Sequence, residues 1–292
     1  LGPSTLVVSL PSKWIKNNQV AAGHELELAE QQGGLFISSR QQTIVKETVD
    51  IRSADNLIKR IVAGKYLRGA DEIEVKVDSS IKAKTIQKRV NEMIGMEVVE
   101  QGKDHLLLKE VGSSNQDTLD AMTRRALFIL QSISDESLQA LKNKESDLEF
   151  LKDMESNLNR FTDYCFRLLN KYGHPQARKT APTYCALYIM EEIGDEYKHL
   201  IDFIMAKEIK VSDELLSIYA RINRFQKQMN TLFLNYSQEK AIRLADERDE
   251  VKKEIRAALD SARSANEAIV LKHFDAIVDS TIRMLGQLLI LC

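Results

Sequence analysis

Two pairs of acidic residues are spaced so that each pair would lie on one face of a helix. Glu191 and Asp195 are four residues apart, and Asp275 and Asp279 repeat that spacing. Side chains four residues apart in an α-helix are neighbours, and two like charges there repel each other. A bound cation would relieve this repulsion, and carboxylate oxygens suit a hard cation. These four residues are therefore candidate ligands of a metal ion whose identity the sequence does not define.

Further acidic residues precede each pair by one helix. Asp246 and Glu250 are also four residues apart, and they would face Asp275 and Asp279 if the two helices packed together. The stretch 153–159, ahead of the first pair, holds two carboxylates and two asparagines. The alternative is that all of these residues form solvated faces, because such pairs arise by chance in a chain with 29% charged residues.

Short motifs typical of catalysis are missing from the sequence. It contains no GxxxxGK or GxGxxG loop, no HExxH, no GxSxG and no CxxC. The pattern predicts a binding or regulatory protein and not an enzyme.

The acidic pairs lie in long segments with the periodicity of amphipathic helices. We expect helices at about 116–141, 146–171, 181–207, 213–235, 238–264 and 266–291. Helices of similar length joined by short loops form antiparallel bundles, here either one bundle of six or two of three. Glu191 and Asp275 are 84 residues apart, which favours a duplicated three-helix unit. The two repeats would span about 113–210 and 211–292.

The segment 43–112 predicts a small α+β domain. We expect strands at 48–51, 70–77, 97–100 and 105–108, and helices at about 53–69 and 79–95. Ser53 would cap the first helix, and Asp78 or Ser79 the second. The order β-α-β-α-β-β predicts helices on one face of a sheet. We interpret the basic residues on these helices as solubilising surface side chains in preference to a binding face.

The first 42 residues predict a small β unit. Residues 5–10 favour a strand, 13–16 a single helical turn, and 24–30 a second strand. A glycine turn at 32–34 would then lead into a returning strand that begins at Leu35. So few short elements cannot close a core alone. The unit therefore either packs against its neighbour or interleaves with a second copy.

This unit resembles the AbrB/SpoVT-type swapped-hairpin domain. The resemblance rests on Gly2-Pro3-Ser4-Thr5-Leu6-Val7-Val8-Ser9-Leu10-Pro11-Ser12-Lys13-Trp14, followed by Ala22-Gly23-His24-Glu25-Leu26-Glu27-Leu28. It implies an intertwined homodimer that in this family usually binds DNA. Lys13 and Lys16 are the candidate phosphate contacts, although they could equally be solvated helix edges.

The helical part resembles PhoU-domain proteins. Met190-Glu191-Glu192-Ile193-Gly194-Asp195 is similar to their repeated Glu/Asp-x-x-x-Asp signature, although Val278 replaces the glycine in the second repeat. The resemblance implies two tandem three-helix bundles that bind metal through these acids. It also implies a negative regulator of phosphate uptake that communicates with a phosphate transporter and a sensor kinase. Archaeal chains of this kind join an AbrB-like head to PhoU repeats.

Composition limits the class of protein. The 292 residues carry 41 Lys and Arg against 43 Asp and Glu, so no overall basic surplus points to nucleic acid. Three cysteines fit a reducing compartment, and no apolar run approaches the roughly 20 residues of a membrane span. We also expect the natural chain to begin before Leu1.

Together these patterns predict a multi-domain α+β protein in the cytoplasm, with no stable membrane insertion. We expect a swapped-hairpin domain at 1–42, an α+β domain at 43–112 and an all-α domain of tandem three-helix bundles at 113–292. The expected function is a homodimeric regulator of phosphate uptake that binds promoter DNA. The alternative is an adaptor that binds no DNA and docks on a phosphate transporter ATPase or a sensor kinase.

Overall fold

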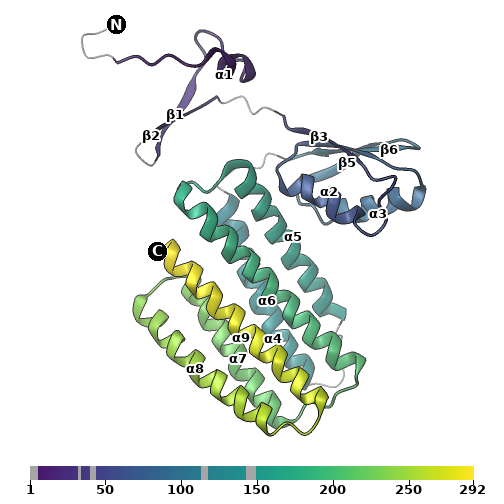
Figure 1. The fold of residues 1–292 in the computed structure, drawn as a ribbon, viewed down its shortest axis with the longest axis vertical. Coiled ribbons are helices and arrows are strands. Elements are labelled where there is room, and N and C mark those ends of the chain that lie inside the picture. The colour runs from purple at the N-terminus through teal and green to yellow at the C-terminus, as the bar shows by residue number, and fades with distance from the viewer. Residues whose placement is uncertain (1–5, 32–33, 40–43, 113–117, 143–148) are drawn as a thin grey trace.

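A computed structural model describes residues 6–31, 34–39, 44–112, 118–142 and 149–292. The fold is mixed α+β, with two small sheets and a helical C-terminal region. Figure 1 shows a hairpin unit at one end, a second sheet with two helices beside α5, and six long helices that make up most of the molecule.

The N-terminal unit contains one short helix and a two-stranded hairpin. Helix α1 spans Ser12–Asn17, and strands β1 (Leu26–Gln31) and β2 (Gly34–Ser39) pair antiparallel, as the alternating sequence predicts. The turn residues 32–33 and the first five residues lie outside the described part of the chain. The strand expected at 5–10 is wrong for residues 6–10, which are exposed and form no strand. A strand needs a partner for its backbone groups, and this segment has none within its own described chain.

The second sheet is covered by helices on one face. It has the order β3-β4-β6-β5, with β3 parallel to β4 and the other neighbours antiparallel. Its elements are β3 (Lys46–Asp50), α2 (Ile58–Leu67), β4 (Glu72–Lys76), α3 (Ser80–Val90), β5 (Met96–Gln101) and β6 (His105–Glu110). This is the predicted order, and Ser79 caps α3 through a bond from the Lys82 amide. Ser53 caps nothing, because α2 begins only after Leu57.

The six long helices agree closely with the predicted segments. They are α4 (Thr118–Lys142), α5 (Glu149–Tyr172), α6 (Thr180–Ala206), α7 (Asp213–Leu234), α8 (Gln238–Asp260) and α9 (Ala265–Leu291). Ser212, Ser237 and Ser264 each accept a bond from a first-turn amide of the helix that follows. These serines explain why the helices begin where they do.

Along the chain the six long helices form two consecutive sets of three, the triplets α4–α6 and α7–α9, but the most extensive contact among them joins one triplet to the other, α6 to α9. Within α4–α6 and within α7–α9 every helix contacts the other two, and the groups meet chiefly through α6 with α9 and α4 with α7. The helices that join the groups thus hold matching places in the two triplets, as a duplication would produce. Their buried apolar residues are continuous with the core of the second sheet.

Helix α5 carries the junction with the second sheet. Arg167 is 1% exposed, and its guanidinium donates to the carbonyls of Tyr66 and Ala70, both at 2.8 Å, and to Glu110 at 3.0 Å. One turn later Lys171 donates to Glu110 at 2.8 Å and also to Asp71. The carboxylates that pair with these two cations belong to the segment that forms the second sheet. The junction is therefore an ion-pair network with little access to water.

Within the described part of the chain, none of the helices combines the length and the apolar character that crossing a bilayer requires.

Candidate functional site

The two predicted acidic pairs lie at matching places on α6 and α9. On α9, Lys252 bridges both acids of the pair, whereas on α6 Lys198 contacts only Asp195 and joins it to Glu155 of α5. What the two helices share is thus an acidic pair with a lysine on at least one of its carboxylates, and the two lysines come from different helices.

On α6, Lys198 joins the pair to the neighbouring helix. Its Nζ lies 2.8 Å from Asp195 Oδ1 and 2.8 Å from Glu155 Oε1 on α5. Glu155 is buried and also accepts a bond from Asn159 at 2.5 Å. Burial is the largest single effect and would raise the pKa of Asp195, but the bonds to Lys198 and Glu155 and the charge of Lys198 together outweigh it, so that the pKa is lowered.

On α9, the bridge comes from the preceding helix. Lys252 of α8 places Nζ 2.6 Å from Asp275 Oδ1 and 2.8 Å from Asp279 Oδ1. The lysine is the least exposed member of this group, with 15% of its side chain accessible. Burial lowers its pKa, but the two carboxylates outweigh that effect and raise it, so the lysine stays charged.

Glu191 differs from the other three acids because it forms no hydrogen bond or ion pair with another described residue. Burial raises its pKa to about 7, and the charges of Asp163 and Asp195 act in the same direction. Asp163 in turn lies 2.7 Å from Arg89 Nη2 on α3. The α6 pair therefore contains a partly buried carboxyl that titrates near neutral pH and that feels the charges of Asp163 and Arg89.

Gly194 allows α5 and α6 to approach closely at this site. A Cβ at Gly194 would lie 2.4 Å from Leu158 Cδ2, closer than real contacts allow, and both residues are buried. At the matching place on α9, Val278 is fully buried. The glycine of the acidic motif thus has a packing reason in the first triplet that does not hold in the second.

The structure does not bring Asp246 and Glu250 to the α9 pair. Both are exposed on α8, and neither has a hydrogen bond or ion pair to Asp275 or Asp279 among the described residues. The face of α8 that meets α9 carries Lys252 instead. The expected four-carboxylate face is absent here because the rotation of α8 about its axis turns these acids to solvent.

As arranged, the acidic pairs do not fit a resident metal ion. The described residues include no group of three or more His, Cys, Asp or Glu side chains placed to hold one. Lys198 and Lys252 also put an ammonium where a cation would sit. The residues are a carboxylate–lysine network that a metal would first have to open.

Lys13 and Lys16, the candidate DNA contacts, are both exposed on α1. Neither has an ion-pair partner in the described part of the chain, so both are available to an external anion.

Several residues of the site were not predicted as site residues: Arg89, Asp163, Lys198 and Lys252. Lys198 follows Asp195 by three residues, a spacing that could have indicated the bridge. The contacts of Arg89 and Lys252 depend on which helices are neighbours and on how each helix is rotated about its axis. The sequence alone carries no signal for either.

Comparison of the chain with protein-family models, with curated protein sequences and with solved structures gives no match.

Proposed function

We propose that this protein is a homodimeric regulator of phosphate uptake that acts in the cytoplasm on transcription, with the helical body as sensor or adaptor. The observation that carries the proposal is the recurrence of an acidic pair at matching places on α6 and α9, with a lysine on Asp195 in the first pair and on both Asp275 and Asp279 in the second. This is the arrangement in which the resemblance to PhoU-domain proteins places the two acidic signatures. The N-terminal hairpin provides the second support.

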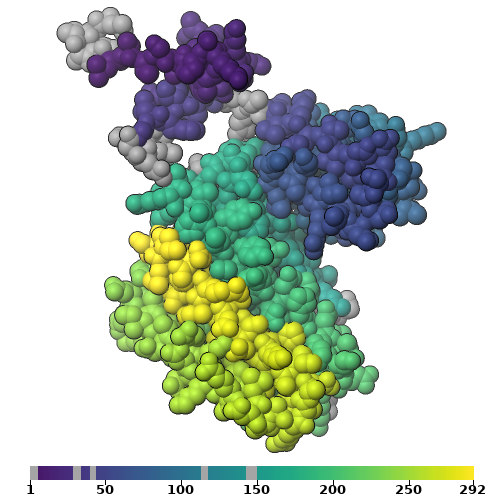
Figure 2. Space-filling view, in the orientation of Figure 1, coloured from purple at the N-terminus to yellow at the C-terminus, as the bar shows by residue number. Residues whose placement is uncertain are grey.

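The hairpin unit exposes apolar side chains that need a cover. Leu28, Leu35 and Phe36 are 59–63% exposed, and Leu6 in the preceding segment is 98% exposed. Figure 2 shows this unit projecting at one end of the molecule. Exposed apolar area of this kind is costly in water. A second copy that pairs with residues 6–10 and covers the hairpin would remove the cost and form the homodimer.

DNA binding would use the exposed lysines of α1. In a dimer, Lys13 and Lys16 of both copies double the positive charge presented to the phosphate backbone. The proposed target is promoter DNA of phosphate-uptake genes.

A gel-shift experiment tests this proposal. The full chain should retard promoter DNA of a phosphate transporter, and the double variant Lys13→Gln/Lys16→Gln should weaken binding by about tenfold or more at low salt. The matched control is Lys103→Gln/Lys207→Gln, which removes the same charge from exposed sites outside the unit. Equal loss in both double variants, or no retardation at low salt, would overturn DNA binding.

One observation favours the alternative of an adaptor that binds no DNA. A groove of about 500 Å³ lies between α7 and α8, with Arg224, Lys227, Lys240 and Arg243 around the apolar Leu232 and Leu244. Such a groove suits an acidic amphipathic helix of a phosphate transporter ATPase or a sensor kinase. Co-purification of such a subunit with the wild type, and its loss with Lys227→Glu/Lys240→Glu, would favour the adaptor.

Metal binding at the acidic pairs is a separate proposal, because a divalent cation would have to replace the lysine. We expect Lys252→Met to bind Mn²⁺ through Asp275 and Asp279, seen as a rise in melting temperature that the chelator EDTA reverses. No metal-dependent rise in Lys252→Met would exclude the pair on α9 as a cation site.

A further inference from the structure

A pocket of about 450 Å³ lies between α2 and α3, outside the acidic pairs and the hairpin unit. It is lined by Asp55, Asn56, Ile58, Lys59, Arg60, Ala63, Thr85 and Arg89. Its volume is within the range of small-molecule sites and exceeds what a single phosphate ion needs.

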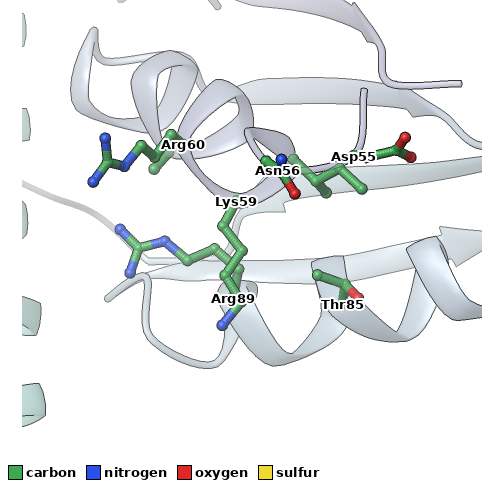
Figure 3. A pocket seen from close by; sticks show the side chains of 8 residues that line it. Asp55, Asn56, Lys59, Arg60, Thr85 and Arg89 are labelled. Atoms are coloured by element: carbon green, nitrogen blue, oxygen red, sulfur yellow. The ribbon is translucent and has the colours of Figure 1, made fainter. Parts of the chain in front are cut away.

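Three cationic side chains line this pocket from two elements. Figure 3 shows Lys59 and Arg60 extending from α2 and Arg89 from α3, with both guanidinium groups on the same side. The one acidic residue of the lining, Asp55, points away from them in the same view, and its carboxylate is 3.7 Å from Lys82. The positive charge is therefore gathered at one side of the pocket.

The two cations that α2 contributes to the pocket, Lys59 and Arg60, are not neutralised by any described residue. Lys59 and Arg60 are exposed, and neither forms an ion pair with another described residue. By contrast, Lys65 and Arg68 on the same helix both pair with Glu47, at 2.9 Å each. The basic residues of α2 thus divide into a paired set near β3 and an unpaired set that lines the pocket.

Arg89 connects the pocket to the helical body. Its guanidinium is half-buried and donates to Glu92 and to Asp163 of α5, each at 2.7 Å. These bonds use two of the five N–H donors of an arginine, so the group can also receive an anion. Since Asp163 competes for the same guanidinium, an anion in the pocket would weaken the contact between α3 and α5.

We propose that this pocket binds a small molecule through a phosphate group, held by Lys59, Arg60 and Arg89. Arginine and lysine together form charge-assisted bonds to phosphate oxygens. The phosphate source is either inorganic phosphate or a nucleotide, and the volume leaves room for a nucleoside beside the phosphate. The site does not depend on DNA binding or on the acidic pairs, so it stands apart from the function proposed above.

Isothermal titration calorimetry of the full protein tests this site with inorganic phosphate in one arm and AMP in the other. We expect Lys59→Gln/Arg60→Gln to weaken binding by about tenfold or more, which corresponds to 1.4 kcal/mol. The control Lys84→Gln/Lys88→Gln removes two positive charges from exposed positions of α3 outside the lining and should retain wild-type affinity. Lys59 and Arg60 are exposed, so their exchange leaves the core intact.

Substitution of Asp163, the carboxylate that competes for Arg89, should change the affinity for the anion in the opposite direction. Asp163→Asn removes the charge that Arg89 is paired with, so the affinity for the anion should rise several-fold. Binding of phosphate alone identifies the ion as the ligand, and tighter binding of AMP identifies a nucleotide. Equal weakening by the α2 and α3 double variants, weaker binding by Asp163→Asn, or no heat at about 10 mM of either probe would overturn the proposal.

Discussion

Glu191 is the acid whose protonation should be visible in the stability of the protein. Its pKa in the folded state is raised to about 7, above the ordinary value of 4.5, because it is partly withdrawn from water and lies near other carboxylates. A raised carboxyl pKa contributes stability that is fully present below about pH 4.5. That contribution is lost as the pH rises through 7, when the buried group must become charged.

The variant Glu191→Gln stays neutral at every pH and should therefore stabilise the protein more at pH 8 than at pH 5. The expected gain at pH 8 is about 1–3 kcal/mol, since one pKa unit corresponds to about 1.4 kcal/mol. Urea denaturation at both pH values measures it. Asp246→Asn on the exposed face of α8 is the control and should change little. An equal effect of Glu191→Gln at both pH values would contradict the assigned burial and its cause.

Gly194 tests the close packing of α5 and α6. Gly194→Ala should destabilise the protein relative to Gly286→Ala by about 1–3 kcal/mol, because its new Cβ meets Leu158 in a filled core. Gly286 lies in α9 with no atom near the position of a new Cβ, so alanine there should be neutral or stabilising. Thermal unfolding of the two variants compares them directly. Equal stability would show that the helices can separate at no cost.

At the scale of elements, α5 links the second sheet to the helical body. Arg167 satisfies three acceptors of the sheet side in a site that excludes water, so its removal leaves the carbonyls of Tyr66 and Ala70 without this donor and Glu110 with Lys171 as its remaining basic partner. Arg167→Met should cost about 3–5 kcal/mol of stability. Arg256→Ala on the exposed face of α8 should cost less than about 0.5 kcal/mol. Denaturation curves measure both, and a small loss for Arg167→Met would mean that the junction contributes little.

The element boundaries could be predicted because the signals for them are local. The 3.6-residue periodicity predicted the six helices, and in the structure Ser212, Ser237 and Ser264 cap the last three of them. The strand expected at 5–10 was wrong for residues 6–10 because strand formation depends on a partner, which local composition does not supply. The orientation of α8, which turns Asp246 and Glu250 outward, likewise depends on packing between helices.

Buried polar contacts between the triplets could not be predicted at all. The hydroxyl of Tyr197 on α6 lies 3.0 Å from Asn223 Oδ1 on α7 and 3.1 Å from Ser134 Oγ on α4. In the sequence these residues resemble ordinary members of amphipathic helices. Only the assembled core shows that they satisfy one another across the two groups of three helices, and so help to define the register between them.

At the scale of the whole molecule, the proposed function and the separately proposed phosphate pocket assign different tasks to three parts. The hairpin unit would dimerise and carry Lys13 and Lys16 to DNA. The pocket between α2 and α3 would receive a phosphate group, and Arg89 would relay its presence to Asp163 on α5. The helical body would present the acidic pairs and the α7–α8 groove to partners. A ligand can regulate such a molecule only if it binds two arrangements of the α3–α5 contact with different affinity.

Genome-wide occupancy of the tagged protein in its own cells, grown with ample and with scarce phosphate, tests the central claim most directly. The account predicts enrichment at promoters of phosphate-uptake genes, a change of occupancy with phosphate supply, and loss of enrichment in Lys13→Gln/Lys16→Gln. Occupancy at no defined site, or at sites unrelated to phosphate uptake and indifferent to its supply, would contradict it.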